Sequence, residues 1–309
     1  MVYALASLAF AARYHELPPM EPHELPAPGD VHTVEVDGVV VAYVDLGEGS
    51  GPPLLLVHGL GSWMDFWAHN VEALAQDHRV LVVDLPGYGR SGRPDAPYHP
   101  PWYAEVLVGL LDALAVDEAV WVGHSMGGQV SLTAALEHPE RVAALVLAAP
   151  AGIESFSAGA SAWMKAYWYE SRALEPGEQA LRATFSQQVF RHLDAHAESL
   201  LEARVRMTGT EAFAGTSVAV SRNIAGMLDH PVAHRLDEVE APTLVVFGAD
   251  DRMIPSPVFT GGRSRAIGEL AVRSLPHAEL VVIEDAGHAV HHDQPEAFHQ
   301  ALRGFLEAL

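Results

Sequence analysis

One serine lies in a setting that can make it a nucleophile. Residues 123–128 read Gly-His-Ser-Met-Gly-Gly, directly after an apolar run of strand length and at the start of a helical segment. A G-x-S-x-G pattern between a strand and a helix predicts a sharp turn that leaves the Ser125 hydroxyl at the edge of a sheet. The helix N-terminus supplies partial positive charge and a free backbone N–H beside that hydroxyl. This pattern indicates acyl transfer through a serine.

A base and an acid that could activate this serine follow later in the chain. An imidazole must accept the hydroxyl proton, and a carboxylate must hold the imidazole in one tautomer. Asp250 and Asp251 come just after one apolar run, and His288 comes just after the next. In an open α/β sheet the active site lies outside the carboxyl ends of the strands. The sequence therefore predicts a catalytic set of Ser125, His288 and one of the two aspartates.

A glycine-rich turn after an earlier apolar run can supply the remaining polar groups. Residues 58–61 read His-Gly-Leu-Gly, where the glycines let the backbone turn an N–H toward a reacting carbonyl. We expect the backbone N–H groups of Leu60 and Met126 to form an oxyanion hole. His58 is expected to pack and hydrogen-bond within the fold, because it ends a strand just before a glycine.

The elements that must position these residues alternate between strand and helix. Two β-rich runs flank Asp37-Gly38, a strong two-residue hairpin signal. We expect strands at 31–36, 39–45, 54–57, 80–83, 119–122, 144–147, 244–247 and 280–283, and helices at 66–75, 102–115, 126–137 and 295–309. Runs that are apolar on both faces belong to a covered sheet, which usually has parallel strands. The alternation predicts an α/β doubly wound fold.

The strand signal disappears between Pro150 and about Leu236. Residues 151–236 are too many for a strand–helix connection, so we expect an inserted helical cap that divides the core into 31–150 and 237–309. Most aromatic side chains of this insert should belong to its own core. As a group above a catalytic serine, some are expected to line an apolar pocket.

Together these motifs resemble the capped serine α/β-hydrolases of the carboxylesterase-like type. The resemblance rests on residues 58–61, 84–91, 123–127, 248–255 and 287–288. It implies a mostly parallel eight-stranded sheet and catalysis without a cofactor. In that family the Gly-x-x-Asp-x-x-Ile-Pro pattern places the acid at Asp251, and Asp84 resembles a structural turn residue. Haloalkane dehalogenases and epoxide hydrolases carry an aspartate at the elbow, so Ser125 disfavours them.

We therefore expect a serine hydrolase that cleaves small carboxylic esters with apolar groups through an acyl-enzyme intermediate. Three alternatives use the same serine triad: a C–C bond hydrolase, a cofactor-free perhydrolase or haloperoxidase, and a hydroxynitrile lyase. A further alternative is a non-catalytic small-molecule receptor on the hydrolase fold. The intact triad and oxyanion turn argue against the receptor.

Composition limits the partners. Among 309 residues, 40 are acidic and 18 are basic, which gives a formal charge of −22. A negative field repels phosphate backbones, so no nucleic-acid partner is expected. Cysteine is absent, which excludes disulfides and cysteine–zinc sites. Neither a cofactor nor a metal is expected, and His291 and His292 are interpreted as part of a surface cluster.

The first thirty residues lie outside the recognisable pattern. Residues 2–12 are apolar at helical spacing, but no positive residue precedes them and the run is too short to span a bilayer. We expect a short helix followed by a proline-rich arm over residues 1–30, packed on its own domain. The alternatives for this segment are a homo-oligomer contact and a membrane-surface anchor, and the little positive charge of the helix disfavours them. We also expect a cytoplasmic protein without an integral membrane segment.

Overall fold

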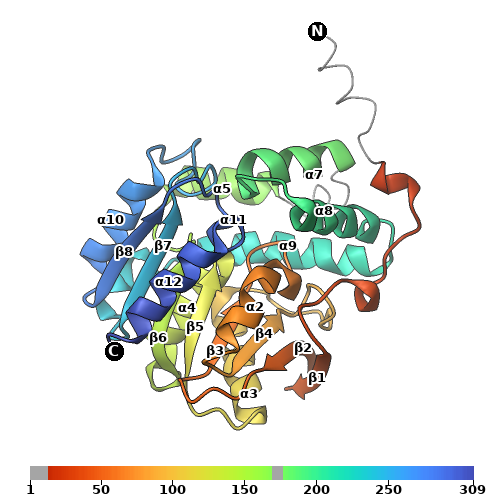
Figure 1. The fold of residues 1–309 in the computed structure, drawn as a ribbon. Coiled ribbons are helices and arrows are strands. Elements are labelled where there is room, and N and C mark those ends of the chain that lie inside the picture. Colours follow the sequence, from red (N-terminus) through yellow and green to blue (C-terminus); the bar gives the residue numbers. More distant parts are fainter. Residues whose placement is uncertain (1–12, 169–176) are drawn as a thin grey trace.

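One mixed sheet of eight strands organises the computed structural model, which describes residues 13–168 and 177–309 (Figure 1). The strands are β1 (Val31–Val36), β2 (Val39–Leu46), β3 (Leu54–Val57), β4 (Val80–Asp84), β5 (Ala119–His124), β6 (Val142–Ala148), β7 (Thr243–Gly248) and β8 (Ala278–Ile283). Their order is β1-β2-β4-β3-β5-β6-β7-β8. β2 is antiparallel to both neighbours and the other pairs are parallel, which confirms the predicted architecture.

Alternate residues of the central strands face two separate apolar cores. In β3, Leu55 and Val57 pack in one core, and Leu54 and Leu56 pack in the other. The first core is covered by α3 (Pro100–Ala113), α4 (Met126–Glu137) and α10 (Ser264–Ser274), and the second by α2 (Ala68–Leu74), α11 (Val290–Asp293) and α12 (Pro295–Leu306). Since successive strand residues point to opposite faces, a strand covered on both sides must be apolar throughout.

Helices replace strands between β6 and β7. The described part of this segment contains α5 (Ala158–Tyr167), α7 (Glu178–Thr184), α8 (Ala195–Met207) and α9 (Ala212–Asp229). These helices lie together over one end of the sheet (Figure 1). The Ala289 N–H donates to the carbonyl of Val189 at 2.9 Å, and Arg191 contacts Asp250. The inserted helices therefore lie over the segments that follow β7 and β8, at the carboxyl ends of the strands.

The N-terminal arm packs on this inserted segment of its own chain. The predicted helix at 2–12 lies outside the described residues. The arm contains two short 3₁₀ turns, Tyr14–Glu16 and Pro22–Glu24, and Tyr14 donates a hydrogen bond to Glu198 of α8 at 2.6 Å. Arg206, also of α8, donates to the carbonyl of Pro18 at 2.9 Å. The homo-oligomer contact through the arm stays a prediction.

Two elements differ from the sequence-based expectation. Helix α10 was not predicted, although Ile267 and Ala271 lie at helical spacing and are buried on its inner face. β8 is the last strand of the sheet, and its residues are mostly only half-buried, because no strand covers its outer edge. Its apolar run, which was interpreted as a strand covered on both sides, therefore belongs to an edge strand.

The burial of a leucine in this two-sided core predicts how much a leucine-to-alanine substitution lowers the free energy of unfolding. Leu56 is fully buried in β3, whereas Leu270 on α10 is 40% exposed. We expect Leu56→Ala to lower the free energy of unfolding by about 2–5 kcal/mol, because it leaves a cavity between sheet and helices. The matched change Leu270→Ala should cost less than about 0.5 kcal/mol. Urea unfolding measures both, and equal losses would contradict the burial pattern.

Candidate active site

Ser125 lies at a strained turn between β5 and α4. Its backbone has φ 54° and ψ −117°, a conformation that side-chain-bearing residues rarely adopt. The Ser125 N–H donates to the carbonyl of Ala148 at 3.0 Å, and its own carbonyl accepts from the N–H of Ala151 at 2.9 Å. A Cβ atom on Gly127 would lie 2.3 Å from the carbonyl oxygen of Val57. The close packing of α4 on β3 therefore requires glycine at position 127. The two hydrogen bonds of the Ser125 backbone hold the turn in this conformation.

His288 and Asp251 are joined where β7 and β8 end. Asp251 Oδ2 lies 3.0 Å from His288 Nδ1, and the two side chains are 0% and 3% exposed. The second carboxylate oxygen of Asp251 accepts from the N–H groups of Met253 at 2.7 Å and Ile254 at 3.0 Å. The carboxylate is thereby fixed as an acceptor for Nδ1–H, and the tautomer that satisfies it leaves the Nε2 lone pair free.

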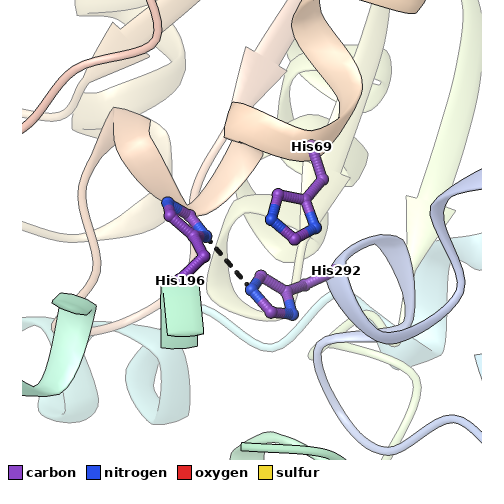
Figure 2. A group of neighbouring side chains, drawn as sticks. All are labelled: His69, His196 and His292. Atoms are coloured by element: carbon purple, nitrogen blue, oxygen red, sulfur yellow. Dashed lines mark hydrogen bonds between the residues drawn. The ribbon is translucent and has the colours of Figure 1, made fainter. Parts of the chain in front are cut away.

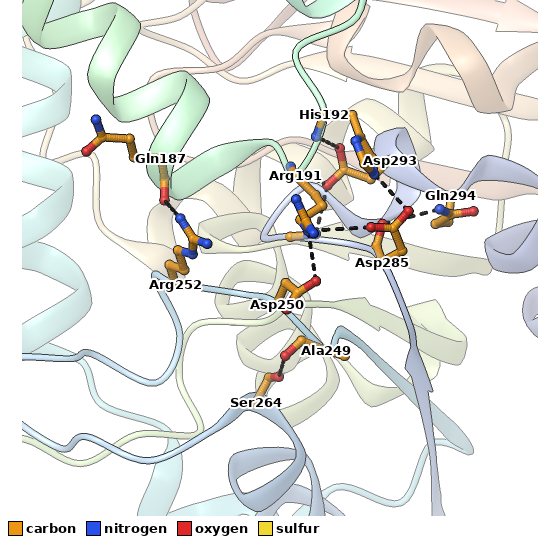
Figure 3. Close-up of polar contacts among 11 residues, drawn as sticks. Gln187, Arg191, His192, Ala249, Asp250, Arg252, Ser264, Asp285, Asp293 and Gln294 are labelled. Atoms are coloured by element: carbon orange, nitrogen blue, oxygen red, sulfur yellow. Dashed lines mark hydrogen bonds and ion pairs between the residues drawn. The ribbon is translucent and has the colours of Figure 1, made fainter.

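Asp250 faces the surface, away from His288. Its Oδ2 atom accepts from Arg191 Nε at 2.9 Å, and the side chain is 45% exposed. Arg191 also lies 3.5 Å from Asp285, so a charged group joins the inserted segment to the loops after β7 and β8 (Figure 3). The structure therefore brings Asp251, and not Asp250, to the histidine.

His124 connects the serine turn with the His288 segment. It precedes Ser125 in the chain, is buried, and its Nε2 atom lies 3.1 Å from the main-chain oxygen of His288. The two rings are 4.8 Å apart. In the described part of the chain the Ser125 hydroxyl forms no hydrogen bond with His288. Such hydrogen bonds are often long without substrate and tighten in the reacting complex.

The turn after β3 lies beside Ser125. A Cβ atom on Gly59 would be 3.1 Å from the Ser125 Cβ. Among the described residues, neither the Leu60 N–H nor the Met126 N–H donates a hydrogen bond, the latter because it opens helix α4. Two backbone donors next to the nucleophile are what an oxyanion hole requires.

His58 and Asp84 hold this part of the fold together. His58 Nδ1 lies 2.8 Å from the Gly59 carbonyl, and its Nε2 accepts from the Leu85 N–H at 3.0 Å. The two carboxylate oxygens of Asp84 accept from the N–H groups of Met64 and Arg90, both at 2.7 Å. The predicted hydrogen-bonding role of His58 is confirmed, and Asp84 fixes two turns as a buried structural residue.

A buried cation that was not predicted from the sequence lies beside the site. Arg204 of α8 forms no hydrogen bond among the described residues, and its Nη1 atom is buried without a partner. Its guanidinium lies over the ring of Phe213 at 5.3 Å. A Cβ atom on Gly61 would lie 3.5 Å from Arg204 Nη2, which places the guanidinium against the turn after β3. Burial lowers the pKa of Arg204 to about 10. The sequence alone does not show which arginine is buried or whether it has an acidic partner, so Arg204 could not be singled out.

The interpretation of His291 and His292 as surface residues is wrong. Their exposed fractions are 0% and 3%, because α11 packs between α2 and α12. Among the described aromatic side chains of the insert, some are buried and others are exposed. Phe185, Phe190 and Phe213 are buried, whereas Trp163, Tyr167 and Trp168 are between 40% and 54% exposed. The predicted apolar pocket stays a prediction.

Comparisons with known proteins agree with this architecture. Residues 52–295 match the family model for the alpha/beta hydrolase fold. A 2-hydroxy-6-oxononadienedioate/2-hydroxy-6-oxononatrienedioate hydrolase of Paraburkholderia phymatum is 32% identical over 86% of this chain and 90% of its own length. A pimeloyl-[acyl-carrier protein] methyl ester esterase of Vibrio atlanticus is 31% identical over 84% of this chain and 96% of its own length.

A solved structure extends the similarity to the whole fold. The crystal structure of a probable hydrolytic enzyme from Pseudomonas aeruginosa PAO1 superposes with a TM-score of 0.85 and 26% identity, over 94% of this chain and 98% of the other. The chain therefore belongs to the α/β-hydrolase family. These comparisons support a hydrolase enzyme. Within the described residues, no helix has the length and apolar character needed to cross a bilayer.

Four buried histidines make the stability of the fold depend on pH. Burial lowers the pKa of His58 to about 4 and that of His292 to about 3, and it lowers the pKa values of His124 and His291 well below the usual range. Between about pH 6.5 and pH 4 the unfolded chain binds protons at these histidines and the folded chain does not. Burial raises the pKa of Asp84 to about 6, a shift of opposite sign that offsets only one histidine.

We therefore expect the free energy of unfolding to fall as pH decreases from about 6.5 to about 4. Each neutral buried histidine contributes a slope of about 1.4 kcal/mol per pH unit. Urea unfolding at pH 7 and pH 5 measures the change. His58→Gln should reduce the slope, whereas His234→Gln, at an exposed position, should leave it unchanged. A slope that is the same in all three proteins would contradict the assignment.

Proposed function

We propose that this protein is a serine hydrolase that cleaves carboxylic esters through an acyl-enzyme intermediate. The observation that carries the proposal is the buried hydrogen bond of Asp251 to His288, at the sheet edge where the strained turn presents Ser125. The methyl ester esterase among the relatives supports an ester substrate. Residues 151–236 form the cap of the proposed enzyme.

Each group of the site has one task in this mechanism. His288 Nε2 accepts the hydroxyl proton while Ser125 Oγ attacks the carbonyl carbon, and the carbonyl oxygen becomes an oxyanion. The N–H groups of Leu60 and Met126 stabilise that oxyanion. His288 then gives its proton to the leaving alkoxide, so an alcohol departs and an acyl-serine remains. A water molecule then attacks the acyl-serine while His288 accepts its proton. His288 returns the proton to Ser125 Oγ, and the carboxylic acid is released. Asp251 holds the imidazole and stabilises its cationic form.

A C–C bond hydrolase is the second candidate, and Arg204 supports it together with the Paraburkholderia relative. A buried arginine without a carboxylate partner is costly unless a ligand supplies the negative charge. Arg204 lies against the turn that carries Leu60, so a carboxylate on the substrate could reach it while a carbonyl lies at Ser125. The Paraburkholderia relative is named for a dicarboxylate substrate. An acidic substrate is compatible with either an ester or a C–C bond as the cleaved group.

Adjacent aspartates provide a matched test of the mechanism. Asp251→Asn should lower kcat for ester hydrolysis by about 10⁴, because the amide cannot hold the productive histidine tautomer. Asp250→Asn makes the same chemical change one residue away and loses only a surface ion pair with Arg191. We expect less than about threefold loss for Asp250→Asn. Steady-state kinetics on a p-nitrophenyl ester measure both. Equal losses, or a larger loss at Asp250, would show that the acid is assigned to the wrong residue.

Arg204 predicts a preference for acidic substrates that can be measured on one pair of compounds. The pair is an ester with a free carboxylate in its acyl part and the same ester with that carboxylate methylated. Arg204→Met keeps the apolar stem and removes the charge. We expect kcat/KM for the acidic ester to fall about 30-fold or more, because a buried charge loses its partner, and kcat/KM for the neutral ester to stay within about threefold. A loss of the same factor on both esters would contradict a role in substrate charge.

A further inference from the structure

Three histidines from distant parts of the chain meet in a group that shares no residue with the set of Ser125, His288 and Asp251. His69 lies on α2, His196 on α8 and His292 on α11 (Figure 2). Each ring has one nitrogen atom that lies within 4.8 Å of a nitrogen atom of each of the other two rings. Two of the helices belong to the hydrolase core and α8 belongs to the insert, so the group bridges the two parts of the chain.

The closest pair already has the spacing of two ligands of one metal ion. His196 Nδ1 lies 3.1 Å from His292 Nε2. Two imidazole nitrogens bound to one tetrahedral Zn²⁺ at about 2.0–2.1 Å lie about 3.3 Å apart. The ring of His69 is 4.4 Å from that of His292 and 4.7 Å from that of His196. The third ligand is therefore within reach of the same point.

Two carboxylates complete the surroundings of this group. Asp65 is 4% exposed, and its Oδ2 atom lies 3.2 Å from His196 Nε2. A carboxylate that binds the outer N–H of a histidine fixes the ring and leaves the other nitrogen free to bind a metal. Asp194 Oδ1 lies 3.7 Å from His292 Nε2 and offers an oxygen as a fourth ligand. The edge of Phe190 packs on His292, with ring centroids 4.6 Å apart, and keeps water from one side.

Metal binding requires the rings to turn. A ring nitrogen binds a metal in the plane of its ring, whereas the planes of His69 and His292 are only 19° from parallel. Rotation about the Cβ–Cγ bond brings the lone pairs together, and this torsion has a broad energy profile. His69 and His196 are half-buried, which gives these rings room and gives an ion a route from solvent. His292 Nδ1 has no partner in the described part of the chain, so turning that ring breaks only the contact of its Nε2 atom with His196 Nδ1, which bonds to the ion would replace.

We propose that His69, His196 and His292 bind one divalent transition-metal ion, with Zn²⁺ as the preferred ion. Imidazole ligands suit Zn²⁺, Co²⁺, Ni²⁺ and Cu²⁺, whereas Mg²⁺ and Ca²⁺ prefer oxygen. The ion ties α8 of the insert to α2 and α11 of the core. Since none of the three ligands belongs to the set of Ser125, His288 and Asp251, the ion takes no part in the chemical step. Its effect is on the packing of the insert against the core. The proposal is independent of the reaction that the enzyme performs.

Direct binding of the metal alone tests this site. The full-length protein is treated with EDTA, the chelator is removed, and Zn²⁺ is titrated by calorimetry. We expect one tight equivalent and a higher melting temperature, and we expect Mg²⁺ to give neither. Co²⁺ should give the visible absorption bands of a four-coordinate nitrogen and oxygen site. Weak binding of several equivalents, as expected from scattered surface histidines, would overturn the proposal, and so would the absence of binding.

Variants with a matched control assign the ion to these residues. His69→Gln and His196→Gln should each weaken Zn²⁺ binding by more than about tenfold and abolish the Co²⁺ bands, and Asp65→Asn should weaken it by about 10–100-fold. His230→Gln removes an exposed histidine of a different ring pair, in which the His99 and His230 rings are 4.5 Å apart, and should bind Zn²⁺ as the original protein does.

The melting temperature of each variant in EDTA shows whether it folds, so a folding defect is not mistaken for loss of a ligand. Equal affinity in folded His69→Gln, folded His196→Gln and the original protein would overturn the assignment.

Discussion

The conformation of one residue, Ser125, organises the site. Its left-handed backbone is stabilised by strand β6 and the turn after it: the carbonyl of Ala148 accepts the Ser125 N–H, and the Ser125 carbonyl accepts the N–H of Ala151. The absence of side chains at Gly123 and Gly127 lets α4 approach β3 and β5. The sheet thus supplies the hydrogen bonds that offset backbone strain. At the same edge of the sheet, the segments that follow β7 and β8 carry Asp251 and His288.

A second feature of the described residues is a set of buried side chains in which at least one polar atom has no hydrogen-bond partner. His124 and His291 keep neutral rings in apolar surroundings, and Arg204 keeps a charge there with an aromatic face beneath it. Such groups cost free energy in the folded state. An acidic substrate at Arg204 and a metal ion at the three-histidine group would each supply a missing partner.

The sequence predicts what local periodicity and strand-end motifs encode. The five runs of β3 to β7 lie where expected because they are covered on both faces, and β1 and β2 flank the predicted hairpin turn at Asp37-Gly38. Helix α4 matches its predicted range of 126–137. The pairing of Asp251 with His288 follows from their positions after adjacent strands. Helix α10 was missed, and so was the burial of His291 and His292. Burial of a polar ring depends on which helices pack around it, and a single sequence does not carry that information.

The proposed active site depends most directly on the nucleophilicity of Ser125. An active-site fluorophosphonate reacts with a serine only when a base removes its proton and donors stabilise the oxyanion, so it reports the whole arrangement at once. Intact-mass and peptide mass spectrometry after incubation give the stoichiometry and the position of the adduct. We predict one adduct per chain, on Ser125, and none in Ser125→Ala. A folded protein that is not labelled, or labelling that persists in Ser125→Ala, would contradict the proposed mechanism.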